Sequence, residues 1–251
     1  MSFTDAGAYD LFMGRFSSRL AVAFADFALP RRVGRVLDVG CGPGALTTVL
    51  AARLGHEAVS AIDPSEPFVD AVRARLPGVS VRQGAAEELP FADAVFDAAL
   101  SQLVVHFMTD PSAGIGEMVR VTRAGGAVAA CVWDMENGRA PHSVFLRVLS
   151  EVTGRSDGRE RVGSRQGELV RLLHEAGCHD VAETELTVES DYATFEEWWE
   201  VHSLGVGPTA GVLDGIPADD VDELRRRCRA LVGDDEITVQ ATAWAARGTA
   251  P

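Results

Sequence analysis

The sequence predicts an α/β fold in which a seven-stranded, mostly parallel sheet is flanked by helices. From about residue 33 onward, short apolar β-type runs alternate with segments of helical period, which is typical of βαβ units. The 251 residues suit one domain, and a composition of 47% hydrophobic and 24% charged residues provides a sizeable core. We therefore expect a single domain over residues 1–251, without internal repeats.

Five strands and their connecting helices are expected in the first half of the chain. Residues 35–40 form an apolar run that ends in glycine, and a helix with an apolar face follows over residues 45–54. Ser65 and Asp110 are typical N-cap residues, so a helix is expected after each of them. The other four strands of this half are expected at residues 58–63, 79–81, 95–103 and 126–133.

The second half of the chain has a looser pattern. Residues 135–163 are rich in Gly, Arg and Ser, so we expect a mobile connection or cap there. A helical insertion is expected over about residues 194–232, before the last strand. The remaining expected elements are a helix at 169–176, a sixth strand at 181–190 and a seventh at 237–245. The predicted domain thus consists of a helical N-terminal arm (1–32), a core (33–134), the connection and a C-terminal half (164–251).

The charge balance excludes several function classes. There are 23 basic and 37 acidic residues, for a formal net charge of −14, and every basic residue is arginine. A Schiff-base enzyme, a P-loop nucleotide site and a protein kinase all require a lysine, so none of them fits this chain. An acidic protein also lacks the basic footprint that nucleic-acid binding requires, so no nucleic-acid partner is expected.

Targeting and cysteine signals are weak in this sequence. No apolar run reaches membrane-spanning length, and Met1 is not followed by a basic and then apolar secretory leader. The four cysteines are scattered without CxxC or His-spaced patterns, which predicts buried thiols and no metal site. We expect a cytoplasmic protein without a membrane partner. The sequence carries no signal for the oligomeric state.

The richest segment is a glycine loop between the first strand and the next helix, with Gly40, Gly42 and Gly44. Glycines there let the backbone turn tightly and approach a ligand, and they place N–H groups of the helix start near it. Asp63 follows Gly44 by nineteen residues and ends the second strand, where a carboxylate can accept from ribose hydroxyls. The segment therefore predicts a nucleoside-containing cofactor at the carboxyl edge of the sheet.

Two cofactors remain open on the glycine pattern alone. Gly40, Gly42 and Ala45 also fit the dinucleotide fingerprint G-x-G-x-x-G/A, so an NAD(P)-dependent oxidoreductase is an alternative. Asp38 favours a different ligand, because a carboxylate two residues before the first glycine would oppose a pyrophosphate but suits a cation. S-adenosylmethionine is such a ligand, with its sulfonium and ammonium groups.

These motifs resemble a known family. VLDVGCGPG resembles the first motif of class I S-adenosylmethionine-dependent methyltransferases, and AIDPS resembles their second-strand acidic motif. The resemblance continues in QGAAEELPF (83–91), FDAA (96–99), EMVRV (117–121) and GG (125–126), and YDLFMGRF (9–16) is similar to the start of small-molecule members. It spans residues 9–133 and implies a Rossmann-like fold, S-adenosylmethionine as cofactor and S-adenosylhomocysteine as product.

The resemblance also implies roles for individual residues. Asp63 would bind the ribose, Pro64 would pack on the adenine, and Asp38 would hold the loop or the cofactor ammonium. Ala85 stands where many relatives have an aspartate, so adenine recognition falls to the backbone near Ala86, to Glu87 or to water. The remaining implied contacts are the loop residues Gly40, Cys41 and Gly42, the Ser101 carbonyl at the ammonium, and Tyr9 and Arg15 at the carboxylate.

The implied reaction is direct displacement, in which an O, N or C nucleophile of a small organic acceptor attacks the methyl carbon. Alignment of the two reactants is then the main contribution of the protein. His106 is the candidate base, with a structural role for its ring as the alternative, and His142 and His202 are further histidines that could face the acceptor. Tryptophans 133, 198 and 199 are candidates for an apolar acceptor wall. A non-catalytic cofactor-binding protein is a third alternative.

Overall fold

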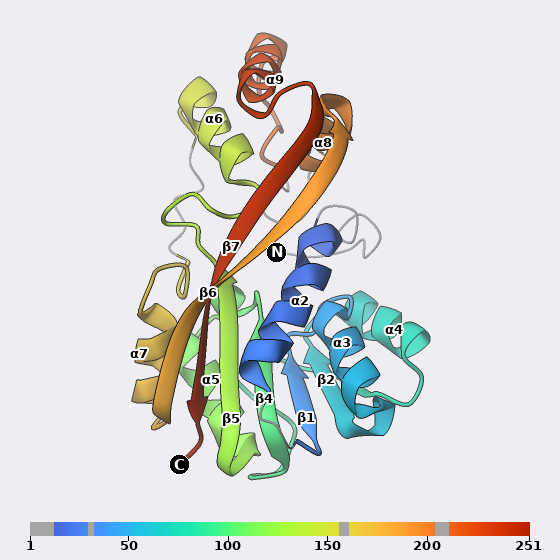
Figure 1. Ribbon diagram of the computed structural model, residues 1–251, viewed down its shortest axis with the longest axis vertical. Coiled ribbons are helices and arrows are strands. Elements are labelled where there is room, and N and C mark those ends of the chain that lie inside the picture. The colour runs from blue at the N-terminus through green and yellow to red at the C-terminus, as the bar shows by residue number, and fades with distance from the viewer. Residues whose placement is uncertain (1–12, 30–32, 156–160, 204–210) are drawn as a thin grey trace.

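The computed structural model describes residues 13–29, 33–155, 161–203 and 211–251. Seven strands form one sheet in the order β3-β2-β1-β4-β5-β7-β6, as Figure 1 shows. The strands are β1 (Val36–Val39), β2 (Val59–Asp63), β3 (Ser80–Gln83), β4 (Phe96–Gln102), β5 (Thr122–Trp133), β6 (His179–Thr194) and β7 (Asp235–Thr249). The predicted fold class is confirmed.

The sheet is parallel from β3 through β5, and β7 inserts antiparallel between β5 and β6. The strand order reverses beside β1, because β2 and β3 lie on one side of it and β4 on the other. At such a switch point the two flanking connections leave toward opposite faces, which opens a crevice at the carboxyl ends of the strands. This crevice is where the glycine loop lies.

Helices cover both faces of the sheet (Figure 1). Side chains alternate between the faces, so Val36 of β1 packs with α2 and α3, whereas Leu37 and Val39 pack with α5 and α7. The helices are α2 (Arg15–Ala28), α3 (Ala45–Leu54), α4 (Glu66–Arg75), α5 (Pro111–Val121), α6 (Ser143–Thr153), α7 (Glu168–Glu175), α8 (Phe195–Ser203) and α9 (Ala218–Val232), with short 3-10 turns η2 (His56–Ala58) and η3 (Val105–Phe107).

Strands β6 and β7 continue beyond the end of β5 as a two-stranded ribbon. The pairing of β5 with β7 ends at Trp133 and Ala243, whereas β6 and β7 stay paired as far as Thr194 and Asp235. A hairpin alone is only marginally stable in water. Here α6, α8 and α9 gather at its far end, in the upper part of Figure 1, and bury apolar side chains against it. We call the far half of the ribbon with these three helices the cap.

The second half of the chain departs from expectation in two places. Residues 135–163 were expected to form a mobile connection or cap without an assigned helix, but they contain α6, whose buried residues Phe145, Val148 and Leu149 follow helical spacing. Glycine and serine residues on both sides of α6 obscure its apolar periodicity in the sequence. Strands β6 and β7 are also longer than expected. β6 continues to Thr194, with buried Tyr192 between exposed Asp191 and Ala193, and β7 runs from Asp235 to Thr249.

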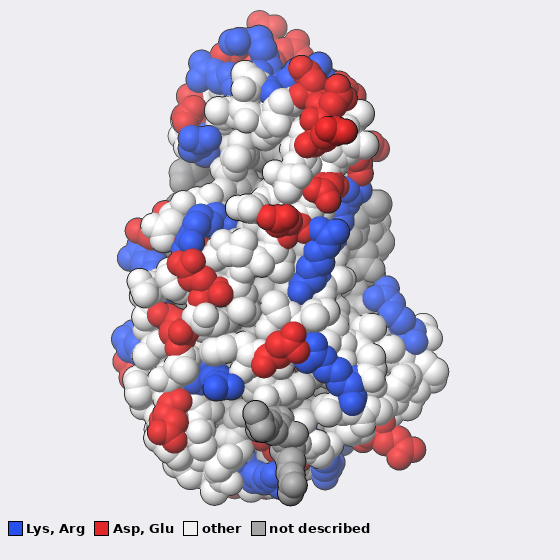
Figure 2. Space-filling view, viewed as in Figure 1, with Lys and Arg blue, Asp and Glu red and all other residues white. Residues whose placement is uncertain are grey.

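The surface carries charges of both signs. On the face in Figure 2, acidic and arginine side chains are interspersed, and ion pairs such as Arg229 with Glu196 join them. All four cysteines are buried and reduced. Among the described residues, no helix combines the length and the apolar character that a membrane span needs.

Candidate functional site

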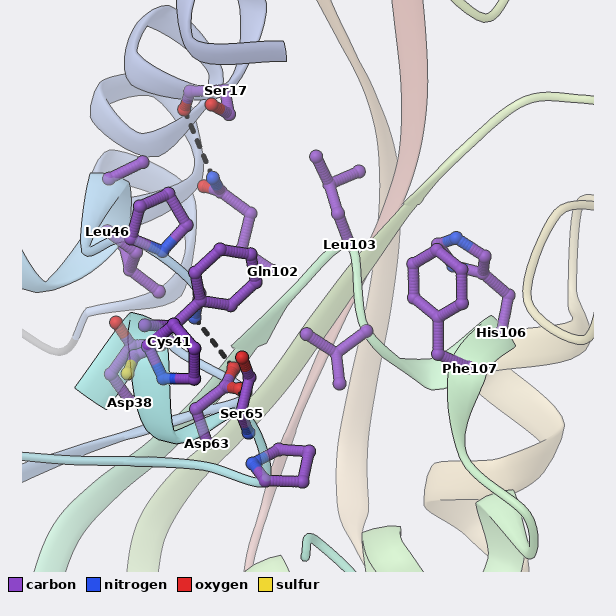
Figure 3. Close-up of a pocket in the computed structure, with 18 of the residues that line it drawn as sticks. Ser17, Asp38, Cys41, Leu46, Asp63, Ser65, Gln102, Leu103, His106 and Phe107 are labelled. Carbon is purple, nitrogen blue, oxygen red and sulfur yellow. Dashed lines mark hydrogen bonds between the residues drawn. The ribbon is translucent and has the colours of Figure 1, made fainter. Parts of the chain in front are cut away.

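A cavity of about 770 Å³ opens at the carboxyl ends of β1, β2 and β4, and Figure 3 shows it from within. One wall comes from the loop between β1 and α3, with Gly40, Cys41 and Gly42. A second comes from the end of β2 and the start of α4. The third comes from the residues that join β4 to η3, with His106 and Phe107 opposite Asp38 and Asp63.

Asp38 lies at the inner end of this cavity and is 1% exposed. Its Oδ2 accepts a hydrogen bond of 2.6 Å from the hydroxyl of Thr47 on α3. Its Oδ1 is buried and has no hydrogen-bond partner among the described residues. The pKa of Asp38 is raised to about 7, because burial and, to a smaller extent, the nearby Asp63 charge outweigh the opposing hydrogen bond from Thr47. An acceptor atom with no protein donor is thus available to a ligand.

The glycine loop has the backbone conformation that only glycine adopts readily. Gly40 has φ +73°, and a Cβ at this position would lie 2.5 Å from the Val104 side chain. Gly42 has φ +51°, and a Cβ there would meet no atom within 4 Å. Gly40 therefore permits a close approach between two walls of the cavity, whereas Gly42 leaves space for a ligand.

Asp63 ties this loop to the end of β2. Its Oδ2 accepts from the Gly42 N–H at 2.8 Å, and its Oδ1 accepts from the Ser65 N–H at 2.8 Å. Burial raises the pKa of Asp63, while these two N–H groups oppose the rise. Each carboxylate oxygen retains a second lone pair, so Asp63 can hold the loop and still accept from a ligand hydroxyl.

The third wall holds a strained turn that the sequence does not reveal. Leu103 has φ +62°, a conformation that costs a bulky residue about 1–3 kcal/mol and that is found at functional sites. Its N–H donates to the Cys131 carbonyl of β5 at 2.8 Å. The preceding Gln102 donates to the Ser17 carbonyl of α2 at 3.0 Å, which places α2 over the cavity (Figure 3).

His106 lines the cavity from η3, and its ring lies 4.0 Å from the ring of Phe107 between centroids. Its Nδ1 is buried without a hydrogen-bond partner among the described residues. Burial lowers the pKa of His106 to about 3, and the Arg161 charge and His142 contribute to the shift. The ring is therefore neutral at neutral pH.

The structure brings together most of the predicted loop residues but not all of the predicted site. Seven of them line the cavity, namely Asp38, Gly40, Cys41, Gly42, Asp63, Pro64 and His106. Five are not among its lining residues, namely Arg15, Ala85, Ala86, Glu87 and Ser101. Tyr9 lies outside the described residues. The contacts predicted for these six remain predictions.

Local contacts explain where three of these side chains point. Glu87 Oε1 accepts from the Thr109 N–H at 2.7 Å, so its carboxylate organises the start of α5. Ser101 is fully buried in β4. Arg15 forms an ion pair with Glu197 at 2.5 Å and lies 4.9 Å from the centroid of the Tyr192 ring. A contact between Arg15 and a cofactor carboxylate would require this pair to open.

The other candidate acceptor residues lie in the core of the protein. His142 and His202 are 2% and 1% exposed, and neither lines the cavity. His202 Nδ1 lies 2.8 Å from the Trp198 carbonyl oxygen, and burial lowers the pKa of His202 to about 4. Trp133 and Trp198 are also buried and do not line the cavity. Trp133 instead packs edge-on against Phe16 of α2, and Trp198 packs against Phe145, Phe195 and His202 inside the cap.

The charged side chains among the described lining residues of the cavity are all acidic. Three carboxylates, those of Asp38, Asp63 and Glu66, are among the described lining residues, and no guanidinium is. Together with the unpartnered Asp38 Oδ1, this lining fits a cationic ligand that donates hydrogen bonds. Among the described residues, no group of three or more His, Cys, Asp or Glu side chains is placed to hold a metal ion.

A family model described as a methyltransferase domain matches residues 37–130. An uncharacterised methyltransferase of Mycobacterium tuberculosis is 41% identical over 140 residues, which are 55% of this chain and 54% of that relative. The chain thus matches about half the length of that relative. A demethylmenaquinone methyltransferase of Roseiflexus castenholzii is 30% identical over 201 residues, which are 70% of this chain and 82% of that relative.

A solved structure has the same fold over nearly the whole chain. It is a Thermotoga maritima S-adenosylmethionine-dependent methyltransferase described as a possible histamine N-methyltransferase, with a TM-score of 0.59 and 21% identity. The match covers 97% of this chain and 93% of that one. The glycine loop and Asp63 lie within residues 37–130, which the family model matches. The chain therefore belongs to the class I S-adenosylmethionine-dependent methyltransferases, whose cofactor is S-adenosylmethionine.

Proposed function

We propose that this protein transfers the methyl group of S-adenosylmethionine to an O, N or C nucleophile of a small organic acceptor. The acidic lining of the cavity is the observation that carries this proposal. The described lining residues include three carboxylates and no guanidinium, and one of the carboxylate oxygens, Asp38 Oδ1, is buried without a hydrogen-bond donor among the described residues. A cofactor with a sulfonium and an ammonium group complements that lining, whereas the pyrophosphate of a dinucleotide would be repelled by it.

The residues of the first two walls would hold the cofactor. Asp38 Oδ1 is the acceptor for its ammonium, and the remaining lone pairs of Asp63 accept from the ribose hydroxyls. Gly42 leaves the space in which the nucleoside lies against the loop, and Pro64 covers one edge of it. When bound, the cofactor supplies an activated methyl group, so the protein chiefly aligns the acceptor and excludes water, and such alignment can contribute about 7–11 kcal/mol.

His106 is the candidate that faces the acceptor. Its pKa of about 3 makes it a poor proton acceptor at neutral pH, because general bases work best with a pKa near the working pH. A neutral ring with an unpartnered Nδ1 can still accept a hydrogen bond. We therefore propose that His106 orients the methyl acceptor. Nδ1 or Nε2 of its ring would accept a hydrogen bond from an N–H or O–H group of that molecule.

The names of similar proteins support a small acceptor. The Roseiflexus relative is named for demethylmenaquinone, and the Thermotoga structure for histamine. The cap lies outside residues 37–130, which the family model matches, and we assign it the side chains that would select the acceptor. The proposal includes a cytoplasmic location and no nucleic-acid partner, in keeping with the net charge of −14.

Titration calorimetry with S-adenosylhomocysteine tests the cofactor assignment. The wild type is expected to bind it and to give no heat with NAD. Asp63→Ala is expected to bind at least tenfold more weakly, because a hydrogen bond to a charged group contributes about 1.5–3 kcal/mol and about 1.4 kcal/mol is tenfold in affinity. Asp70→Ala is the matched control and is expected to leave the affinity unchanged, since Asp70 is an exposed carboxylate on α4 and is not among the lining residues of the cavity.

Unchanged affinity in a folded Asp63→Ala variant would overturn the assignment, and binding of NAD alone would favour the oxidoreductase. Mass spectrometry of S-adenosylhomocysteine formation from S-adenosylmethionine and a pool of metabolites then tests the transfer itself. Cofactor binding without product across a broad acceptor panel would identify a non-catalytic binding protein.

A further inference from the structure

A second cavity of about 470 Å³ lies beside α6, between the connection that follows β5 and the residues that precede α9. Its lining differs in charge from that of the cofactor cavity. Three arginines, Arg147, Arg155 and Arg161, line it together with a single described carboxylate, Glu136. In a chain with a net charge of −14, three guanidinium groups at one cavity are a local reversal of the charge balance.

Two of these arginines have unused hydrogen-bonding capacity. Among the described residues, no carboxylate forms an ion pair with Arg147 of α6, and the Arg147 charge acts on the Cys228 thiol of α9, whose pKa it lowers against the effect of burial. Arg155 donates to two backbone carbonyls, those of Asp214 at 2.8 Å and Gly215 at 3.2 Å. These bonds orient its guanidinium without neutralising it, and a guanidinium has five N–H donors.

The negative charge of Glu136, the single described carboxylate of this cavity, is already paired with an arginine that is not among the lining residues. Glu136 Oε2 accepts from Nε of Arg165 at 3.0 Å, and both side chains are about half exposed. The described side chains that line this cavity therefore carry an excess of positive charge. Guanidinium groups are preferred for oxyanions because their planar fork matches carboxylate and phosphate oxygens.

His106 of the first cavity lies near two residues that line the second cavity. His106 lines the cofactor cavity, and its ring lies within electrostatic reach of Arg161 and His142, which both line the second cavity. Figure 3 shows His106 on the wall across from Asp38 and Asp63. A molecule that extends from the second cavity past His106 would approach the cofactor from the side opposite to the carboxylates.

We propose that the second cavity binds an anionic group of the methyl acceptor, a carboxylate or a phosphate, through Arg147 and Arg155. This assignment rests on the proposed function and names the substrate class for it. The two cavities then bind groups of opposite charge: the carboxylates of the first hold the cationic cofactor, and the arginines of the second hold the anionic end of the acceptor. The nucleophile lies between them, beside His106.

The test uses the full chain, with and without saturating S-adenosylhomocysteine, and follows the melting temperature at constant ionic strength. The probes are sodium phosphate, sodium benzoate and the neutral benzamide, each titrated against sodium chloride. Phosphate or benzoate is expected to raise the melting temperature in a saturable way, and benzamide is not. The anion with the higher affinity identifies the group as phosphate or carboxylate.

Arg147→Gln/Arg155→Gln is expected to weaken anion affinity at least tenfold and to leave the affinity for S-adenosylhomocysteine unchanged. Arg147→Gln alone is expected to weaken it at least threefold, which keeps the test valid if the double variant does not fold. Arg171→Gln is the matched control, because Arg171 is an exposed arginine on α7, away from both cavities.

Anion affinities that are equal in wild type and variants would overturn the inference, and so would a wild type that responds to neither anion. The failure of the proposed function has a different signature. In that case S-adenosylhomocysteine does not bind, while the arginine-dependent anion response persists.

Discussion

Asp38 shows how one buried side chain couples the cofactor site to pH. Burial raises its pKa from 3.8 to about 7, so the folded protein keeps a proton that the unfolded chain releases between these values. The contribution of Asp38 to stability therefore falls as pH rises through this window. A bound cation opposes this rise in pKa, because it favours the ionised form of the Asp38 carboxylate.

Cofactor affinity is accordingly expected to rise with pH between 5.5 and 7. The ordinary α-amino pKa of about 7.7–8.0 keeps the ligand ammonium charged throughout this range. Well below the pKa of Asp38, affinity for S-adenosylhomocysteine is expected to fall by up to about tenfold per pH unit. Titration calorimetry at several pH values measures this slope.

Asp38→Asn is the control for that slope. This variant is expected to bind S-adenosylhomocysteine more weakly than the wild type at pH 7. Its affinity is also expected to change less with pH, since the amide cannot ionise. Equal affinity of the wild type at pH 5.5 and pH 7 would contradict this role of Asp38.

At the scale of an element, the loop between β1 and α3 depends on two glycines for different reasons. Gly40 has a positive φ and is also in steric contact with Val104 of the opposite wall. Gly42 has a positive φ but open space beside it, and its N–H is bound by Asp63. The same residue type therefore serves packing at one position and ligand access at the other.

Gly40→Ala is expected to destabilise the protein more than Gly42→Ala. Both variants incur the left-handed backbone cost of about 1–2 kcal/mol, and Gly40→Ala adds overpacking against Val104 of about 1–3 kcal/mol. Adding Val104→Ala to Gly40→Ala is expected to restore part of the free energy of unfolding, measured by urea denaturation. Failure of this rescue would show that the contact with Val104 is not the cause.

Gly42→Ala is expected to show the opposite pattern. Its free energy of unfolding decreases only by the backbone cost, whereas its affinity for S-adenosylhomocysteine falls because the added methyl group occupies ligand space. Calorimetry on the same samples separates the two effects.

At the scale of the whole molecule, the cap is joined to the sheet by one core and by a set of charges around Arg139. Arg139 Nε donates to Asp134 at 2.5 Å, and its Nη atoms donate to Glu185 of β6 at 3.0 and 2.7 Å. The Asp134 side chain is fully buried at the end of β5. Burial raises the pKa of Asp134, but the bonds from Asn137 and Arg139 outweigh it and lower the pKa below the usual value.

Arg139→Met is expected to lower the free energy of unfolding by about 2 kcal/mol, because it leaves a buried carboxylate without its cation while Arg139 itself is partly screened by solvent. Asp134→Asn in the same chain is expected to recover part of the loss. Urea denaturation measures both. Arg171→Met, in an exposed pair with Glu175, is the control and is expected to cost less than about 1 kcal/mol. Equal costs at the two sites would contradict a special role for Asp134.

Much of the fold could be predicted because its signals are local. Each βα unit of the first half has its own apolar run, its own N-cap or glycine and its own helix, so β1, β2 and β4 lie within a residue or two of their expected bounds. The cap was less predictable. The outer parts of β6 and β7 alternate exposed residues with buried ones such as Tyr192 and Ile237, and these buried residues belong to a core cluster shared with helices elsewhere in the chain.

By itself, the sequence determined the α/β class, the cofactor type and the loop that would hold it, with Asp38, Gly40, Gly42 and Asp63. These residues belong to adjacent elements of a parallel sheet, so their spacing along the chain already implies their meeting at one edge. Only the tertiary structure decided the rest: the partner of Arg15, the strained Leu103, and the cavity that is lined by the arginines of α6 and of the residues after it. Their neighbours come from distant segments, and packing of the whole chain selects such contacts without leaving a local pattern in the sequence.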